Sequence, residues 1–196
     1  MKRCTKMYEN NYKNKTATSI NDLEIFLQLM ADLDHEIELF AIGGTAMVLK
    51  GIKESTKDID FLTNANYETI RRMFTSAGLI EKSGSKLVNI WFMRDVRIDI
   101  FYEEFILGVS LPEDWKRMSE QVREIGKVKL YILNWYDIII TKIARAEKRD
   151  YEDILAIIKA QKISFRKLKK RYYSISETAI ISDPDEKFKH LERMLR

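Results

Sequence analysis

The sequence predicts an α+β fold, in which a mixed sheet with flanking helices is followed by a C-terminal helical bundle. Short apolar or alternating segments are interleaved with helical segments in the first two thirds of the chain, which is typical of a mixed sheet. From Asn134 onward, apolar residues recur at helical spacing alone. We therefore expect a polar leader over residues 1–18, a core over residues 19–132 and a helical part over residues 133–196.

The composition of the 196 residues excludes several classes of protein. Cys4 has no second cysteine to pair with, and two histidines with one cysteine do not provide the common zinc-site spacings. A metal would have to bind to carboxylates, which favours hard ions such as magnesium. No apolar run approaches the ~18 residues that span a bilayer, and residues 1–14 lack the apolar stretch of a signal peptide. We expect a cytoplasmic protein that does not enter a membrane.

The spacing of apolar residues and the positions of glycines predict the first helix, the first strand and a second, short helix. A helix is expected after a Ser19 or Asn21 cap, where apolar residues recur at helical spacing, at Leu23, Phe26, Leu27, Met30 and Leu33. The apolar segment 37–42 reads as a strand that ends at Gly43-Gly44, and residues 45–50 as a short helix closed by Gly51. The order is strand, glycine turn, helix.

The next segments predict a strand, a helix and a pair of strands. Residues 57–62 alternate charged and apolar side chains as a strand does, and residues 67–77 form a helical pattern that stops at Gly78. Two alternating segments, 87–93 and 96–102, flank Arg94-Asp95 and predict a tight hairpin.

The C-terminal part is helical and carries the positive charge. Residues 142–196 hold 15 basic and 9 acidic side chains, whereas the whole chain holds 34 and 30 for a net charge of +4. The densest basic run, 166–171, precedes Tyr172-Tyr173 and would either attract a polyanion or form a solvated helix face. A last helix is expected from Pro184.

Two aspartates mark the candidate site. Asp58 and Asp60 are two residues apart in an extended segment, so both carboxylates project from one face about 7 Å apart. Two close anions in an apolar strand call for a divalent cation between them, although an edge strand with two solvated acids is the alternative. Asp99 lies at the centre of a second apolar strand and would be the third ligand if the two strands are neighbours.

A glycine turn and a lysine complete the candidate set. Gly43-Gly44-Thr45 ends a strand and opens a helix, where backbone N–H groups and the threonine hydroxyl favour a phosphate. Lys142 falls on the apolar stripe of its helix and needs an anion such as a triphosphate, unless it extends to the surface. Asp150 and Asp153 are expected to pair with nearby basic residues and to orient the helices.

These segments resemble a known superfamily. Residues 42–47 (Ile-Gly-Gly-Thr-Ala-Met), residues 55–61 (Ser-Thr-Lys-Asp-Ile-Asp-Phe) and the later Asp99 resemble the polymerase-β-type nucleotidyltransferases. Within that superfamily they look most like the AbiEii-type abortive-infection toxins and related minimal nucleotidyltransferases. Residues 142–145 and 149–154 are similar to helical motifs of the same proteins.

The resemblance implies an enzyme that moves a nucleoside monophosphate from a nucleoside triphosphate such as ATP to an acceptor hydroxyl. It implies that Asp58 and Asp60 bind two magnesium ions, and that Asp99 completes the metal site and helps to deprotonate the acceptor. For a toxin-like protein the acceptor would be tRNA or a protein and an antitoxin would be a partner, while small molecules such as aminoglycosides remain open. The alternatives are a non-catalytic binding protein with this fold and a carboxylate metal nuclease.

Overall fold

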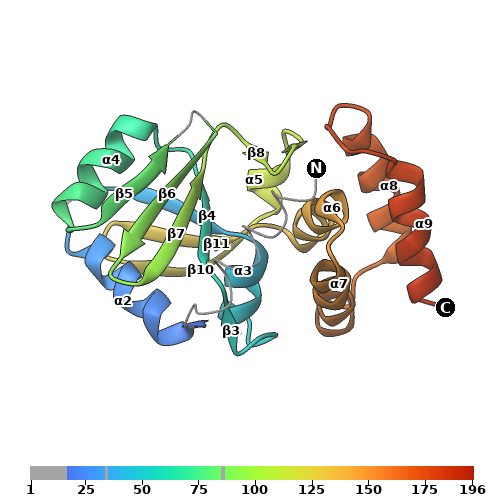
Figure 1. The fold of residues 1–196 in the computed structure, drawn as a ribbon, viewed down its shortest axis with the longest axis horizontal. Coiled ribbons are helices and arrows are strands. Elements are labelled where there is room, and N and C mark those ends of the chain that lie inside the picture. Colours follow the sequence, from blue (N-terminus) through green and yellow to red (C-terminus); the bar gives the residue numbers. More distant parts are fainter. Residues whose placement is uncertain (1–16, 34, 85–86) are drawn as a thin grey trace, which may run out of the picture.

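The computed structural model describes residues 17–33, 35–84 and 87–196. Cys4 and nearly all of the expected leader lie outside these residues. Figure 1 shows a mixed sheet with its helices at one end of the molecule and the C-terminal helices at the other. The expected fold class, a mixed sheet with flanking helices followed by a helical part, is therefore confirmed.

A seven-stranded sheet forms the core, with strand order β10-β11-β2-β4-β7-β6-β5. Its strands in chain order are β2 (Ile37–Ala41), β4 (Ile59–Thr63), β5 (Ile80–Gly84), β6 (Val88–Met93), β7 (Val96–Phe101), β10 (Glu120–Ile125) and β11 (Val128–Ile132). The pairs β11–β2 and β4–β7 are parallel, and the other pairs are antiparallel. Strands β2, β4, β6 and β7 match expected segments, whereas β5, β10 and β11 were not predicted individually.

The helices of the described residues are α2 (Ile20–Ala31), α3 (Gly43–Leu49), α4 (Tyr67–Ser76), α5 (Trp115–Met118), α6 (Trp135–Arg145), α7 (Lys148–Gln161), α8 (Phe165–Ser176) and α9 (Pro184–Met194). Helices α2, α4 and α9 begin close to the expected positions, α3 begins two residues before the expected Thr45, and α5 was not predicted. Ser19 caps α2 through a capping box, as one of the two expected caps. Within the described part of the chain, no helix combines the length and the apolar character needed to cross a membrane.

Two small strand pairs lie outside the main sheet. β1 (Thr18–Ser19) pairs with β3 (Ser55–Thr56), and β8 (Phe105–Ile106) pairs with β9 (Val109–Ser110). Thr18 donates its hydroxyl to the Lys57 carbonyl at 3.1 Å. The last residue of the expected leader is thus attached beside the segment that carries Asp58.

The two faces of the sheet have different partners. The Phe61 ring stacks on Phe26 of α2 at 5.7 Å between centroids, and Phe26 contacts Phe74 of α4, so α2 and α4 cover this face. On the opposite face Phe40 contacts Trp115 of α5 at 4.7 Å. Side chains alternate along a strand, so Asp60, one residue before Phe61, lies on the face away from α2 and α4.

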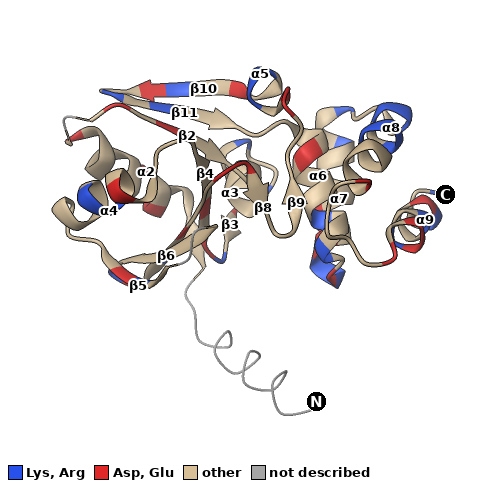
Figure 2. Ribbon diagram, turned by 90° about the horizontal axis from the view of Figure 1, so that it is seen from above, with Lys and Arg blue, Asp and Glu red and all other residues tan. Residues whose placement is uncertain are grey.

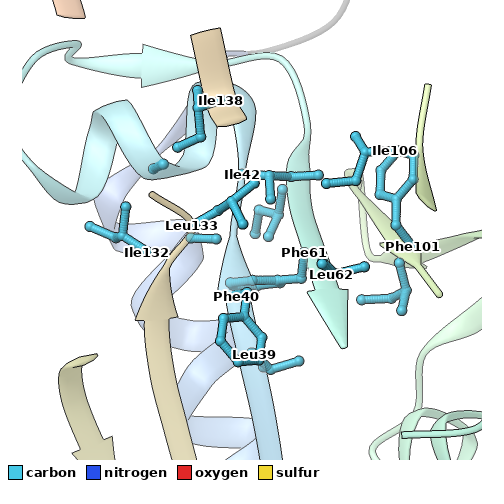
Figure 3. Packing of buried hydrophobic residues seen from close by; sticks show 14 of the residues in the cluster. Leu39, Phe40, Ile42, Phe61, Leu62, Phe101, Ile106, Ile132, Leu133 and Ile138 are labelled. Atoms are coloured by element: carbon cyan, nitrogen blue, oxygen red, sulfur yellow. The ribbon is translucent and has the colours of Figure 1, made fainter. Parts of the chain in front are cut away.

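The helical part joins the core through apolar contacts. Figure 3 shows Ile138 of α6 close to Ile42, at the point where β2 leads into α3. Ile42, Ile138 and the neighbouring Leu133 are all buried. This contact brings one side of α6 towards the sheet face that carries Asp60.

Candidate active site

The structure places the three predicted carboxylates on one face of two neighbouring strands. β4 and β7 are parallel neighbours, and their register places Asp60 directly opposite Asp99. Asp58 immediately precedes β4 and lies two residues before Asp60, so it belongs to the same face. The condition set by the sequence, that the two acidic strands be neighbours, is met.

Asp60 is held in a markedly anionic environment. Burial raises the pKa of Asp60 to about 8, and the negative charges of Asp99 and Asp58 act in the same direction. The positive charges of Arg145 and Lys142 oppose the rise. A half-buried carboxylate beside two others gains most from an added cation, so the electrostatics fit a hard divalent ion.

Arg97 also belongs to this site and was missed by the sequence reasoning. Its Nε lies 2.6 Å from Asp99 Oδ1, and its Nη2 lies 2.7 Å from Asp99 Oδ2. The same Nε lies 3.9 Å from Asp58 Oδ1. Arg97 stands two residues before Asp99, so the alternation that places both aspartates on one face could have found the arginine as well.

The donor set suits magnesium, although its side chains are not gathered around a common point. Among the residues that the structure describes, no three acidic, histidine or cysteine side chains form a group that could hold a metal ion. Asp99 makes its two-pronged contact with Arg97 in this arrangement. Magnesium prefers oxygen ligands in near-octahedral geometry, so its binding would require these side chains to turn towards one another.

The glycine turn lies directly beside the carboxylates. Gly43 has φ of +54°, a conformation that glycine adopts without strain, and a Cβ atom there would lie 3.4 Å from Asp60 Oδ2. A Cβ at Gly44 would lie 2.1 Å from Thr56 Oγ1, so Gly44 allows α3 to approach β3. Ile42, the N-cap of α3, provides no side-chain hydrogen bond to the first N–H groups of this helix.

Thr45 holds the backbone of the two acidic residues of β4 and its N-terminal flank. Its buried hydroxyl accepts a hydrogen bond from the Asp60 N–H at 2.8 Å and donates to the Asp58 carbonyl at 3.4 Å. The contact of this hydroxyl with a phosphate stays a prediction. In the structure the hydroxyl fixes the backbone of both acidic residues, so Thr45 is a positioning residue for them.

Lys142 faces inward, as predicted, and its ammonium group is paired within the protein. Its Nζ lies 2.6 Å from Asp153 Oδ2 and 3.6 Å from Asp150 Oδ1. Asp153 also binds Lys53, which follows α3, at 2.7 Å. The expected orienting role of Asp150 and Asp153 agrees with these contacts, and Asp153 links α6 and α7 to the core.

Other basic groups lie on the same side of the site. Arg145 Nε donates to Asp150 Oδ2 at 2.8 Å, and the charge of Asp60 helps to raise the pKa of Arg145, after the larger effect of the Asp150 hydrogen bond. Burial lowers the pKa of Lys57, and the nearby charges of Arg149 and Arg145 lower it further. The acidic residues of the sheet therefore face a group of cations contributed mainly by α6 and α7.

The basic run of α8 divides into two sets. Lys169 pairs with Glu192, and Arg171 binds both Asp114 and the buried Asp137. Arg166, Lys167 and Lys170 are exposed, and Figure 2 shows basic residues along the outer surface of α8. Part of this run therefore holds α8 against the rest of the protein.

A family model decides the assignment. Residues 19–195 match the model of the family described as nucleotidyltransferase of unknown function (DUF6036). The chain belongs to this nucleotidyltransferase family. A search of curated protein sequences found no match.

Solved structures of nucleotidyltransferases share the fold of this family member. The antibiotic-resistance factor ANT(2'')-Ia aligns with a TM-score of 0.61 and 12% identity over 82% of this chain and 94% of its own. A candidate nucleotidyltransferase from H. pylori aligns with a TM-score of 0.53 and 15% identity over 90% of this chain and 92% of its own. ANT(2'')-Ia has also been solved in complex with adenylyl-2''-tobramycin, and that structure aligns with a TM-score of 0.57 and 13% identity over 80% and 98% of the two chains. At these identities the likeness concerns the fold alone.

Proposed function

We propose that this nucleotidyltransferase is a magnesium-dependent enzyme that transfers a nucleoside monophosphate from a nucleoside triphosphate to an acceptor hydroxyl, with pyrophosphate as the leaving group. The observation that carries the proposal is the register of β4 and β7, which sets Asp60 opposite Asp99 with Asp58 on the same face. Three carboxylates from adjacent strands are the donor set that two-metal phosphoryl transfer uses.

Each part of the site has a role in this proposal. Asp58, Asp60 and Asp99 would hold magnesium, which when bound neutralises the charge that develops on the transferred phosphoryl group. The turn at Gly43 and Gly44 would admit the triphosphate close to the backbone N–H groups that open α3. Asp99 would also receive the proton of the attacking hydroxyl.

The basic side chains of α6 and α7 would face the phosphates from the opposite side. The positive charges of Arg145 and Lys142 are near enough to Asp60 to oppose the rise in its pKa, which supports this placement. Lys142 is paired with Asp153, so its first role would be to hold the helices in place, with a direct contact to the triphosphate as the further possibility to test. This arrangement puts cations on one side of the triphosphate and metal ligands on the other.

The molecule that bears the acceptor hydroxyl is the open part of this proposal. The resemblance to AbiEii-type toxins favours tRNA or a protein as this molecule, together with an antitoxin partner. The structure of ANT(2'')-Ia with adenylyl-2''-tobramycin provides the small-molecule alternative, an aminoglycoside. Mass spectrometry of RNA and protein after expression, looking for an added nucleotide, separates these outcomes.

Labelled nucleoside triphosphates test the reaction directly. We expect magnesium-dependent nucleotide binding by calorimetry and magnesium-dependent transfer of label, both lost in Asp58→Asn/Asp60→Asn. Asp95→Asn is the matched control, because Asp95 lies exposed in the turn between β6 and β7. Nucleotide binding without magnesium, or binding unchanged in the double variant, would contradict the proposal.

Arg97 favours a second candidate, a non-catalytic protein that keeps the fold and acts through a partner. An arginine that binds Asp99 with two hydrogen bonds partly replaces a metal as the counter-charge of the carboxylates. If this candidate is right, the wild-type protein binds no divalent metal at any nucleotide concentration. Metal titration with and without a nucleoside triphosphate distinguishes the two candidates.

A further inference from the structure

Arg97 and its two acidic neighbours form a contact that the proposed chemistry does not use. Arg97 and Asp99 share one face of β7, because they are two residues apart in the strand. The guanidinium approaches both oxygens of Asp99 at 2.6 and 2.7 Å, the fork geometry of the strongest arginine–carboxylate pairs. Only about a fifth of the Arg97 side chain is exposed, so this pair is little screened by water.

The same guanidinium also approaches a second carboxylate. Arg97 Nε is 3.9 Å from Asp58 Oδ1, and Asp58 leads into the strand that pairs with β7. The Arg97 guanidinium therefore lies within 3.9 Å of two of the three expected metal ligands. A divalent cation bound by these ligands would lie close to this guanidinium, and the two positive charges would repel each other.

We propose that Arg97 competes with divalent metal for Asp99, so that metal binding requires the guanidinium to release this carboxylate. The inference rests on the proposed function, because it concerns the same magnesium ligands. It accounts for the absence, among the described residues, of a ready metal group although the register brings the three acids together. Without nucleotide, the protein then binds metal weakly.

Nucleotide provides a reason for the guanidinium to move. A triphosphate carries more negative charge than a single carboxylate, can accept the same two-pronged contact from a guanidinium, and also supplies oxygen ligands to magnesium. Metal and nucleotide should therefore bind cooperatively, with each increasing the affinity for the other by the same factor. Arg97 is in this sense a positioning residue that couples the two ligands.

Manganese binding to the nucleotide-free protein tests the competition. Free manganese is followed by electron paramagnetic resonance at fixed pH and ionic strength in wild type, Arg97→Gln, Arg97→Lys and Arg123→Gln. Arg123 is the matched control, because it pairs with Glu24 at the surface and lies on β10, an edge strand of the sheet. We expect about tenfold tighter binding in Arg97→Gln, the size of a typical coupling between two sites, and wild-type affinity in Arg123→Gln.

Arg97→Lys keeps the charge but loses the two-pronged contact, and we expect its affinity to lie between those of wild type and Arg97→Gln. It decides the question if Arg97→Gln does not fold, since that substitution removes a charged partner of Asp99. Equal or weaker manganese binding in the folded Arg97 variants would overturn the inference. Binding in none of the four proteins, even with nucleotide, would instead refute the proposed magnesium-dependent function.

Discussion

Substitution of Gly44 tests how closely α3 must approach β3 to position the acidic residues. A Cβ atom at Gly44 would lie 2.1 Å from Thr56 Oγ1 and 2.9 Å from Thr56 Cβ. Rotation of the threonine side chain can move the hydroxyl but leaves Cβ where it is. Gly44→Ala must therefore push α3 away from β3, and with it Thr45, whose hydroxyl holds the Asp60 N–H.

Two opposing effects set the size of the change. Overpacking of a filled site costs about 1–3 kcal/mol, whereas alanine is favoured over glycine in a helix by up to about 1 kcal/mol. We expect the free energy of unfolding of Gly44→Ala to fall by about 1–2 kcal/mol, and its Tm by roughly 2–8 °C for a chain of this size. In a Thr56→Gly background both clashing atoms are absent, so Gly44→Ala should stabilise the protein by up to about 1 kcal/mol.

Urea unfolding of wild type, the two single variants and the double variant measures this coupling as a double-mutant cycle. Gly51→Ala is the control, because a Cβ there meets nothing within 4 Å and its cost arises from a φ of +65° alone. That cost should be the same with and without Thr56→Gly. An equal loss of stability on Gly44→Ala in the wild-type and Thr56→Gly backgrounds would refute the packing explanation. The remaining explanation for Gly44 would then be close contact with a phosphate.

Three further predictions follow from the hydrogen bonds and ion pairs. Thr45→Val keeps the side-chain shape but leaves the buried Asp60 N–H without its acceptor, at a cost of about 1–3 kcal/mol, and should abolish label transfer that Thr45→Ser retains. Asp153→Asn removes the carboxylate that binds both Lys53 and Lys142, leaves Lys142 with only its longer contact to Asp150, and should cost about 3–5 kcal/mol in urea unfolding. Lys142→Met should cost less, because Asp153 keeps its other lysine, and the reverse order would contradict this network. Burial alone would raise the pKa of Asp150, but its arginine and lysine partners on α6 and a backbone N–H together lower it below 3.8. The ionised carboxylate therefore stabilises the fold above that pH, so the stability difference between wild type and Asp150→Asn should narrow as the pH falls below about 4 and would stay constant if the interpretation were wrong.

Much of the fold could be predicted because local patterns agree with the tertiary structure. Helix α2 with its Ser19 cap and the hairpin of β6 and β7 each follow from spacing and turn residues. The glycine pair expected as a turn before a helix forms the first two residues of α3 instead. Strands β10 and β11 were not predicted. Most side chains of β10 are exposed, so its sequence does not need to alternate apolar and polar residues. The alternation by which a strand is predicted from sequence is therefore weak in this segment.

The sequence by itself determined that Asp58 and Asp60 share a face and that Asp99 lies within a second apolar strand. It placed Lys142 on the apolar stripe of its helix, but only the structure decided that this side chain is buried. Whether these residues meet depends on which strands become neighbours, and only the parallel pairing of β4 with β7 decided that. The partners of the charged groups were also decided in three dimensions. Arg97 binds Asp99. Asp153 binds both Lys142 and Lys53, and Lys53 lies 100 positions before Asp153 in the chain. A buried charged side chain pairs with an oppositely charged side chain that the packing of helices and strands places within contact distance. The sequence alone does not give the distance between two such side chains.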